Sequence, residues 1–201
     1  MVRNVIFDLG GVVLDWNPDA VLASYYDDFN LRTSMKAAVF QHPDWLQLDR
    51  GTLSEDEAVT QLEKRTNRPK QELIGLFEAV RHSLRPKPDT MALVERLAHR
   101  GVPLYCLSNM PEATFAYLCE RYSFWARFRG VVISGKVKMM KPEREIFEYL
   151  LNRYELAAAA TVFIDDHLPN IVAADALGLH TIWFRDAAQC DSALSRLLGA
   201  E

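Results

Sequence analysis

An apolar run near the N-terminus ends abruptly at a carboxylate that is followed by glycines. The run Val5–Phe7 leads into Asp8, and Gly10 and Gly11 follow two and three residues after it. A short, continuous apolar segment of this kind is typical of a strand buried on both faces of a parallel sheet. Glycines after the strand let backbone amides crowd around a ligand. The pattern therefore predicts a buried first strand that delivers Asp8 to the edge of a sheet.

From about residue 86 onward, strand and helix patterns alternate. Strands separated by helices of about ten residues imply right-handed crossovers and a parallel sheet with helices on both faces. The predicted fold class is therefore α/β, with a three-layer, doubly wound parallel sheet. The predicted strands are 103–107, 130–133, 161–164 and 180–184, and the predicted helices are 89–99, 111–122, 142–154, 170–177 and 192–198.

A helical segment separates the first strand from this alternation. Residues 15–85 show helical patterns at 18–26 and 69–83, and a capping box at Ser54–Glu57 starts a helix between them. The Pro-rich stretch 85–88 has the composition of a hinge. We predict that a small, all-helical cap is inserted after the first strand. The core then comprises residues 1–14 and 86–201, and the cap comprises residues 15–85.

Composition excludes several classes of protein. The net charge of −4, with Lys and Arg dispersed among acids, argues against nucleic-acid binding. No run approaches the ~18 apolar residues of a membrane span, and no signal-peptide pattern opens the chain. The cysteines 106, 119 and 190 lack paired or metal-ligand spacing, which indicates that they are reduced. We expect a cytoplasmic monomer or homodimer that does not bind membranes or nucleic acid.

Further polar residues stand where they can join Asp8. Open parallel sheets bind ligands beyond the carboxyl ends of their strands, so motifs far apart in sequence meet there. Each residue alone also fits a structural role, as a turn former, a helix cap or a surface lysine. The set comprises Ser108 and Asn109 after the strand at 103–107, Lys141 before a predicted helix, and Asp165 and Asp166 after the strand at 161–164.

In this order the motifs resemble those of the haloacid dehalogenase superfamily, a family of aspartate-nucleophile hydrolases dominated by phosphatases. The chain is most similar to the branch of bacterial sugar-phosphate phosphatases and of the N-terminal phosphatase domain of epoxide hydrolases, from residue 2 to about residue 186. The resemblance implies that Asp8 attacks phosphorus and forms an aspartyl-phosphate. It also implies a Mg²⁺ ion held by Asp8, the backbone carbonyl of Gly10 and Asp166.

The same resemblance implies roles for the other motif residues. Ser108 would donate its hydroxyl to a phosphoryl oxygen, helped by the amide of Asn109 at the N-terminus of the following helix. Lys141 would offset the charge of the transition state and steady the nucleophile. Supporting positions, around the ion or the nucleophile, fall to Asp165 and Asn170.

Gly10 departs from the family pattern. Phosphatases of the family usually carry a second aspartate there, which protonates the leaving group and then activates water. Three interpretations stay open. The protein is a phosphatase whose proton comes from the cap, from water or from an acidic leaving group such as an anomeric sugar hydroxyl; or a haloacid dehalogenase, which needs no magnesium; or a binding protein with a disabled site.

The acidic pair Asp165 and Asp166 argues against the dehalogenase. We therefore predict a magnesium-dependent phosphatase of small phosphorylated metabolites, with sugar phosphates favoured. Aromatic and histidine side chains of the insert either select the substrate or form the cap core. They are Trp16, Phe40, His42 and Trp45.

Overall fold

The computed structural model describes residues 2–199 and holds a five-stranded parallel sheet. Its strand order is β3-β2-β1-β4-β5, so the first strand lies at the centre, paired with β2 and β4. All four strand pairs are parallel. This order confirms the doubly wound α/β class. The strands are β1 (Asn4–Phe7), β2 (Leu104–Ser108), β3 (Gly130–Ile133), β4 (Thr161–Asp165) and β5 (His180–Trp183).

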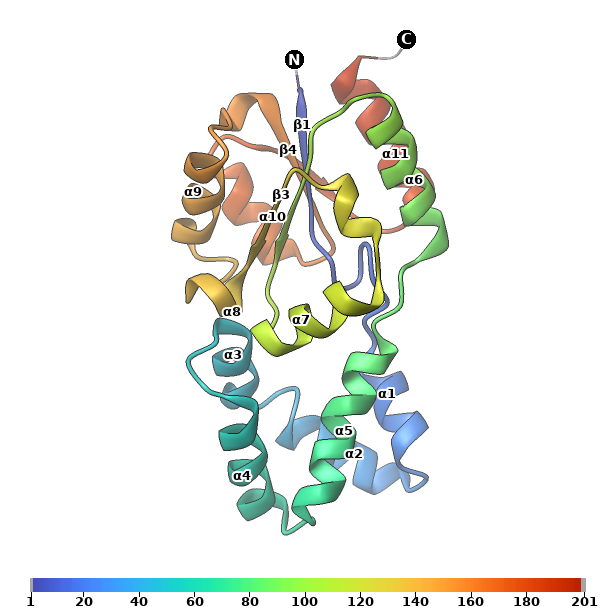
Figure 1. Cartoon of the computed structure of the whole chain (residues 1–201), viewed down its shortest axis with the longest axis vertical. Helices are drawn as coiled ribbons and strands as arrows, with labels where there is room; N and C mark the ends of the chain where they lie inside the picture. Colours follow the sequence, from blue (N-terminus) through green and yellow to red (C-terminus); the bar gives the residue numbers. More distant parts are fainter. Residues whose placement is uncertain (1, 200–201) are drawn as a thin grey trace.

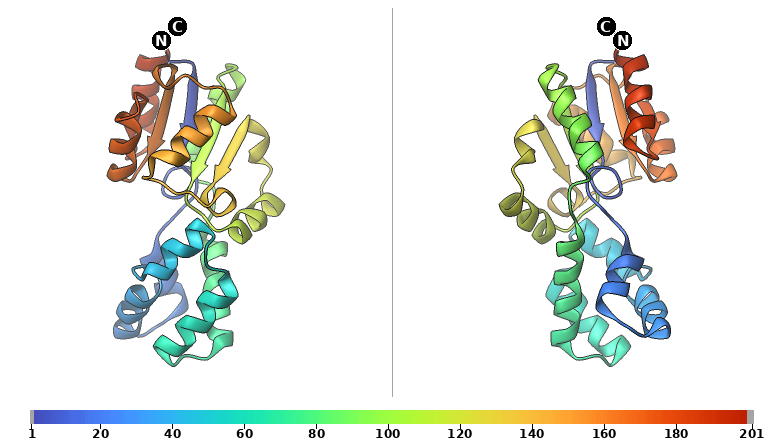
Figure 2. Two further views of the ribbon diagram at one scale, coloured as in Figure 1. Left: turned by 90° about the vertical axis from the view of Figure 1, so that its left-hand side faces the viewer. Right: turned by 90° about the vertical axis from the view of Figure 1, so that its right-hand side faces the viewer.

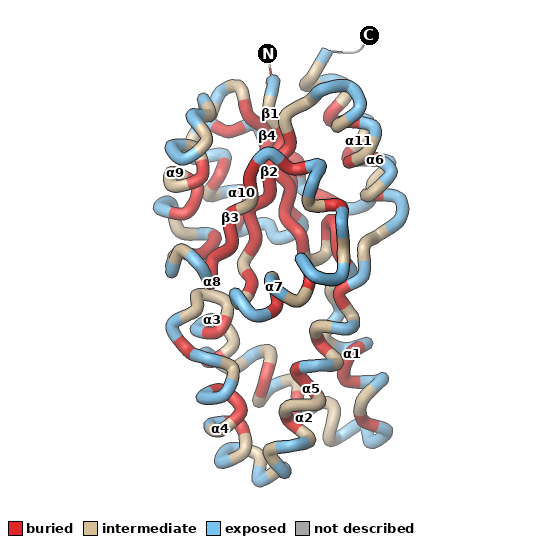
Figure 3. Tube along the Cα trace, in the orientation of Figure 1, coloured by how far each residue is buried: buried red, intermediate tan, exposed pale blue. Residues whose placement is uncertain are grey.

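Helices cover both faces of the sheet (Figure 1). Side chains alternate along β1: Val5 and Phe7 pack with the face of α6 (Pro88–His99) and α11 (Ala187–Leu198). Ile6 points the other way, into the cluster formed with α9 (Arg144–Arg153) and α10 (Leu168–Asp175). The buried residues therefore concentrate along the strands, as Figure 3 shows. Because the central strand is buried on both faces, its carboxyl end is a fixed point from which Asp8 projects.

Five helices lie beyond the carboxyl ends of the strands and pack around a hydrophobic cluster of their own (Figures 1 and 2). We propose that this helical body, residues 15–85, is the cap. Its two connections to the core run side by side, since the amide of Asp15 donates to the carbonyl of Arg85 at 2.8 Å. The helices are α1 (Pro18–Tyr25), α2 (Phe29–Ala38), α3 (Pro43–Arg50), α4 (Glu55–Thr66) and α5 (Lys70–Ser83).

The capping box of α4 is confirmed, with Ser54 and Glu57 each bonded to the other's backbone. The sequence pattern does not separate helices α2 and α3. The last helix begins at Ala187 rather than at residue 192 because Asp186 caps it.

None of the helices within residues 2–199 combines the length and the apolar character that crossing a membrane requires.

The remaining elements connect the strands. After β2 comes α7 (Glu112–Arg121), then a 3-10 turn (Phe124–Arg127) that leads into β3. A short helix α8 (Ser134–Val137) follows β3 directly, and a second 3-10 turn (Ala158–Ala160) precedes β4. Helix α9 starts two residues later than predicted, and α10 starts two residues earlier, at Leu168. These shifts leave every site residue at the same edge of the sheet.

Candidate active site

Asp8 follows the central strand and is held by backbone and side-chain contacts. Its amide donates to the carbonyl of Ile164 at 2.9 Å, which ties it to β4. Its Oδ1 accepts a hydrogen bond from the amide of Leu9 at 2.7 Å and lies 2.8 Å from Nζ of Lys141. Within residues 2–199, no hydrogen bond engages the other oxygen, Oδ2. One carboxylate oxygen is therefore fixed, and the other is left for a ligand.

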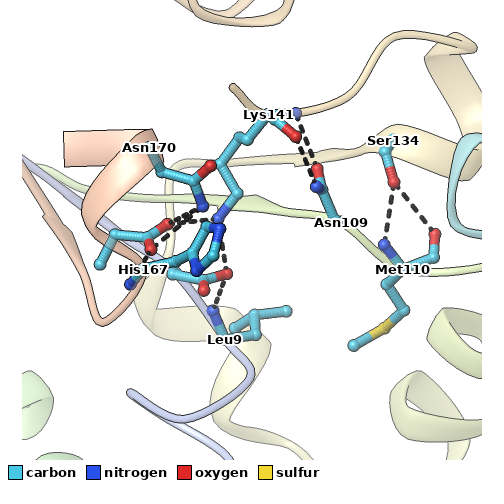
Figure 4. Close-up of polar contacts among 9 residues, drawn as sticks. Leu9, Asn109, Met110, Ser134, Lys141, His167 and Asn170 are labelled. Carbon is cyan, nitrogen blue, oxygen red and sulfur yellow. Dashed lines mark hydrogen bonds and ion pairs between the residues drawn. The ribbon is translucent and has the colours of Figure 1, made fainter. Parts of the chain in front are cut away.

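Lys141 is buried between two carboxylates. Its Nζ lies 2.8 Å from Asp8 and 2.6 Å from Oδ2 of Asp165. Asp165 is itself fully buried, and its Oδ1 accepts from the amide of His167 at 2.7 Å and from the side-chain amide of Asn170 at 3.1 Å (Figure 4). Several hydrogen-bond donors fix the carboxylate of Asp165. The fixed carboxylate in turn holds Lys141 in place opposite Asp8.

Asn109 fixes the backbone of Lys141. Its Nδ2 donates to the carbonyl of Lys141 at 2.9 Å, and its Oδ1 accepts from the amide of Lys141 at 2.9 Å (Figure 4). The prediction that the amide of Asn109 lies at a helix N-terminus is wrong, because α7 begins only at Glu112 with Pro111 as its N-cap. Ser108, the last residue of β2, is buried and lines the cavity described below.

The two glycines after Asp8 differ in what they can accommodate. Gly11 has φ of +81°, and a Cβ built there would lie 2.1 Å from Oδ2 of Asp166, so no side chain fits. The backbone of Gly10 is outside the left-handed region. A Cβ built at Gly10 would have Cβ of Trp16 as its nearest neighbour, at 3.6 Å, which is an ordinary contact. The Gly11 backbone thus packs directly on Asp166, whose carbonyl also accepts from Trp183 at 2.9 Å.

The site carries an excess of negative charge. Burial raises the pKa of Asp8 to about 7, and Asp165 and Asp166 add to this shift while Lys141 opposes it. Burial also raises the pKa of Asp166, with a further contribution from Asp165. For Lys141, burial disfavours the charged form, but Asp8 and Asp165 outweigh it and raise its pKa. Three carboxylates face one ammonium, so an added cation would be bound favourably.

The residues present fit a magnesium ion. Asp8, Asp165 and Asp166 each offer a carboxylate oxygen, and these atoms lie within 4.8 Å of one another. Oxygen-only donor sets are what Mg²⁺ prefers. Since Lys141 and Asn170 already engage Asp165, Asp8 and Asp166 would be the direct ligands. Oδ1 of Asn170 is buried without a hydrogen-bond partner among the described residues and can accept from an ion-bound water.

A cavity of about 470 Å³ lies between the cap and the core. Its core end is lined by polar residues, and Asp165 is not among them. They are Asp8, Ser108, Asn109, Lys141, Asp166, His167 and Asn170. Its cap wall is mainly aromatic and aliphatic, and Trp45 stacks on Trp16 at 5.8 Å and on Phe77 at 6.1 Å between ring centroids. Trp16, Phe40 and Trp45 therefore belong both to the wall and to the cap core.

His42 is not among the residues that line the cavity. Its Nδ1 instead accepts from the amide of Asp44 at 3.2 Å and caps α3. The cap contributes three charged residues to the cavity that were not singled out from the sequence. They are Asp49, Glu55 and Arg81.

Residues 2–178 match the family model of the haloacid dehalogenase-like hydrolases. The chain belongs to this family. Its similarity to one relative, the sesquiterpene phosphatase astK of Aspergillus oryzae, is 30% identity over 197 residues, which is 98% of this chain and 97% of the relative. The D-ribitol-5-phosphate phosphatase of Bacteroides thetaiotaomicron is 26% identical over 218 residues, and the match covers 100% of both chains.

A solved structure shares the family fold. The HAD family enzyme bt-2542 of Bacteroides thetaiotaomicron, in complex with magnesium and inorganic phosphate, superimposes with a TM-score of 0.75. The identity is 21%, and the superposition covers 92% of this chain and 95% of that one. At this identity the likeness establishes the fold of this haloacid dehalogenase-like hydrolase, and its chemistry has to be argued from its own residues.

Proposed function

We propose that this protein is a magnesium-dependent phosphatase that hydrolyses phosphate monoesters of small molecules through an aspartyl-phosphate on Asp8. The observation that carries the proposal is the state of Asp8, which has one oxygen bonded to Leu9 and Lys141 and the other free at the cavity. A fixed carboxylate beside a buried ammonium is arranged to act as a nucleophile toward an anionic centre.

The chain's own residues account for the bonds that form and break at phosphorus in both chemical steps. Asp8 forms a bond to phosphorus as the bond from phosphorus to the leaving oxygen breaks. Lys141 offsets the charge that the phosphoryl oxygens carry, and Ser108 donates its hydroxyl to one of them. Water then attacks the phosphorus and releases Asp8 and inorganic phosphate. When bound by Asp8, Asp166 and the Gly10 carbonyl, magnesium supplies positive charge that reduces repulsion between nucleophile and phosphate.

Supporting residues in this proposal keep the machinery in place. Asp165 orients Lys141, to which it is bonded at 2.6 Å, and Asn170 holds Asp165. Asn109 acts through its paired hydrogen bonds to the backbone of Lys141. Two relatives named as phosphatases support this interpretation over a dehalogenase.

The cavity wall bears on the leaving group. Sugar phosphates, which the sequence favoured, need hydrogen-bonding partners for several hydroxyls, and the ribitol-5-phosphate relative supports them. The cap wall, however, offers mostly aromatic and aliphatic side chains, and the sesquiterpene phosphatase relative is named for a sesquiterpene, an apolar class of compound. We therefore place phosphates of apolar alcohols first and sugar phosphates second. Reaction in the cytoplasm, as monomer or homodimer, stays a prediction.

A phosphate-release panel tests the proposal. The panel contains an aryl phosphate, sugar phosphates, phosphates of apolar alcohols and a 2-haloacid, each assayed with magnesium and with EDTA. We expect magnesium-dependent release of phosphate, with the highest kcat/KM on an apolar phosphate. Halide release from the 2-haloacid in EDTA, with no phosphate release from any monoester, would contradict the phosphatase proposal and indicate a dehalogenase.

A further inference from the structure

An acidic residue of the cap lines the same cavity as the proposed nucleophile. Asp49 is the penultimate residue of α3 and lines the same cavity as Asp8 and Lys141. It is partly buried, and its electrostatic neighbours are these two residues. Within residues 2–199, no hydrogen bond or ion pair engages its carboxylate, and only its backbone carbonyl is used, by Ser134. A partly buried acid with no structural partner for its side chain is free to act on a substrate.

The end of α3 that carries Asp49 is fastened to the core. Figure 1 shows α3 directly beside α8, and the core partners come from the segment that flanks Lys141. These contacts fix the helix end against the core. A second contact joins α5 to α7, where the rings of His82 and Tyr117 lie 5.6 Å apart between centroids. The contacts run from Ser134 Oγ to the Asp49 carbonyl, from Lys138 Nζ to the Gly51 carbonyl, and from Arg50 to Glu143, with Nη1 at 2.9 Å from Oε2.

The chemistry lacks one component on the core side. An alkoxide leaving group needs a proton in the transition state, and the position two residues after Asp8 is Gly10, which has none to give. The backbone at Gly10 would accept a Cβ atom, whose nearest neighbour is Cβ of Trp16 at 3.6 Å. The absence of an acid there therefore has no steric cause at the level of Cβ, and an acid from the cap can take its place at the leaving oxygen.

We propose that Asp49 of the cap is the general acid and base of the reaction, an inference that rests on the proposed phosphatase function. The Asp49 carboxyl gives its proton to the leaving oxygen as the phosphorus–oxygen bond breaks and the bond from Asp8 to phosphorus forms. The Asp49 carboxylate then takes a proton from water as the water oxygen attacks phosphorus and the bond from Asp8 breaks. Both steps conserve protons, and Asp49 returns to its protonated form.

The surroundings of Asp49 suit this exchange. Burial raises its pKa to about 7, and the charge of Asp8 adds to the shift while Lys141 opposes it. Both protonation states are then accessible near neutral pH, where a general acid and base works best. The other ionisable groups in the cavity are otherwise engaged or belong to the core. Glu55 is paired with Arg81 at 2.5 Å, and His167 follows the acidic pair Asp165–Asp166.

The test compares kcat/KM for an alkyl phosphate with kcat/KM for an activated aryl phosphate, whose leaving group needs no proton. This parameter reports steps up to departure of the leaving group, so it isolates the acid step from later hydrolysis. We expect Asp49→Asn to lower the alkyl value by ~100-fold or more and the aryl value by only a few fold. Glu55→Gln and His167→Gln, as controls, should leave the alkyl-to-aryl ratio within about threefold of wild type.

Gly10→Asp provides a second readout. Introduced into Asp49→Asn, it should raise kcat/KM for the alkyl phosphate at least about tenfold above that of Asp49→Asn alone, because it returns an acid to the core side. Introduced alone, it should leave the ratio within about threefold of wild type, since the proton is already supplied. The single variant keeps the test decisive even if Asp49→Asn does not fold, and circular dichroism with a melting curve establishes folding of each variant.

Two results would overturn the role of Asp49. One is a folded Asp49→Asn chain with an unchanged ratio, and the other is a Gly10→Asp single variant with a ratio raised tenfold or more. Neither result touches the phosphatase proposal itself, which depends on magnesium-dependent hydrolysis of the aryl phosphate by the wild-type protein. A wild-type protein without that activity would remove both proposals together.

Discussion

The ammonium of Lys141 lies 2.8 Å from Oδ1 of Asp8, and both residues are buried at the carboxyl edge of the sheet. The pair leaves Oδ2 of Asp8 as the atom that a ligand can reach. Asp165 holds the far side of the ammonium at 2.6 Å, so the position of Lys141 does not depend on Asp8 alone. The geometry makes separate predictions for the nucleophile and for the lysine.

Asp8→Asn should abolish turnover and leave the fold intact. The amide is nearly isosteric and keeps an oxygen for the Leu9 hydrogen bond, but it cannot form the acyl phosphate. We expect phosphate release to fall at least ~10³-fold, with a melting temperature close to that of wild type. Residual activity within about tenfold of wild type would contradict a nucleophilic role.

Lys141→Met should destabilise the protein and should do so more at high pH. Removing one partner of a buried ion pair costs about 3–5 kcal/mol, because the carboxylates stay buried without compensation. The pKa of Asp8 is raised in the folded state to about 7, above its ordinary value of 3.8, so folding favours its protonated form. Loss of Lys141 strengthens this shift, and stability then decreases as pH rises from the unfolded pKa toward the folded one.

Melting curves at pH 5.5 and pH 8 check the lysine prediction. The deficit of Lys141→Met relative to wild type should be smaller at the lower pH. Lys136→Met removes an exposed lysine of α8 and serves as the control, with a deficit below about 1 kcal/mol at both values. An equal deficit for Lys141→Met at both pH values would mean that uncompensated carboxylates are not its cause.

Gly11→Ala should impair magnesium binding, whereas Gly10→Ala should not. The new methyl group at Gly11 would lie 2.1 Å from Oδ2 of Asp166 and would require a backbone φ of +81°. At Gly10 the methyl group makes only an ordinary contact with Trp16. Magnesium should raise the melting temperature of wild type and of Gly10→Ala, and this rise should be lost in Gly11→Ala and in Asp166→Ala. If magnesium raised the melting temperature of Asp166→Ala as much as that of wild type, Asp166 would not be a magnesium ligand.

Leu46→Ser should weaken the use of apolar substrates without affecting folding. Leu46 is 55% exposed yet lines the cavity, so it has apolar surface available to a ligand. We expect kcat/KM for an apolar phosphate to fall about fivefold, equivalent to ~1 kcal/mol, and that for a sugar phosphate to change little. Phe29→Ser, at a 70% exposed residue outside the cavity lining, is the matched control. Equal losses on both substrates would argue against an apolar leaving group.

The sequence predicted those parts of the site that local chemistry determines. A buried strand that ends in a carboxylate is recognisable on its own, and so are the glycines that follow it. Asp8, Ser108 and Asp165 each end or directly follow a strand, and parallel pairing brings strand ends together without further information. The central position of β1 likewise follows from its continuous apolar character.

Long-range contacts were beyond reach of the sequence. Asn109 was expected to use its backbone at a helix start, but its side chain binds Lys141, which is 32 residues away. Asp49 belongs to a helix that no clear hydrophobic periodicity predicts. The position of Asp49 depends on a hydrogen bond from Ser134, which is 85 residues away. A carboxylate in a short amphipathic helix is normally a solvated surface residue. Only the docking of α3 on the core distinguishes Asp49 from such residues.

The fastening of α3 to the core also sets an order of events. A substrate that enters between α3 and the core has to part the contacts that Arg50 makes with Glu143 and that Ser134 makes with Asp49. The same opening carries the Asp49 carboxylate away from Asp8. On the proposed roles, Asp49 would reach the leaving oxygen only while the end of α3 is docked on the core. Entry by this route and proton transfer would therefore occur at different times in the reaction cycle.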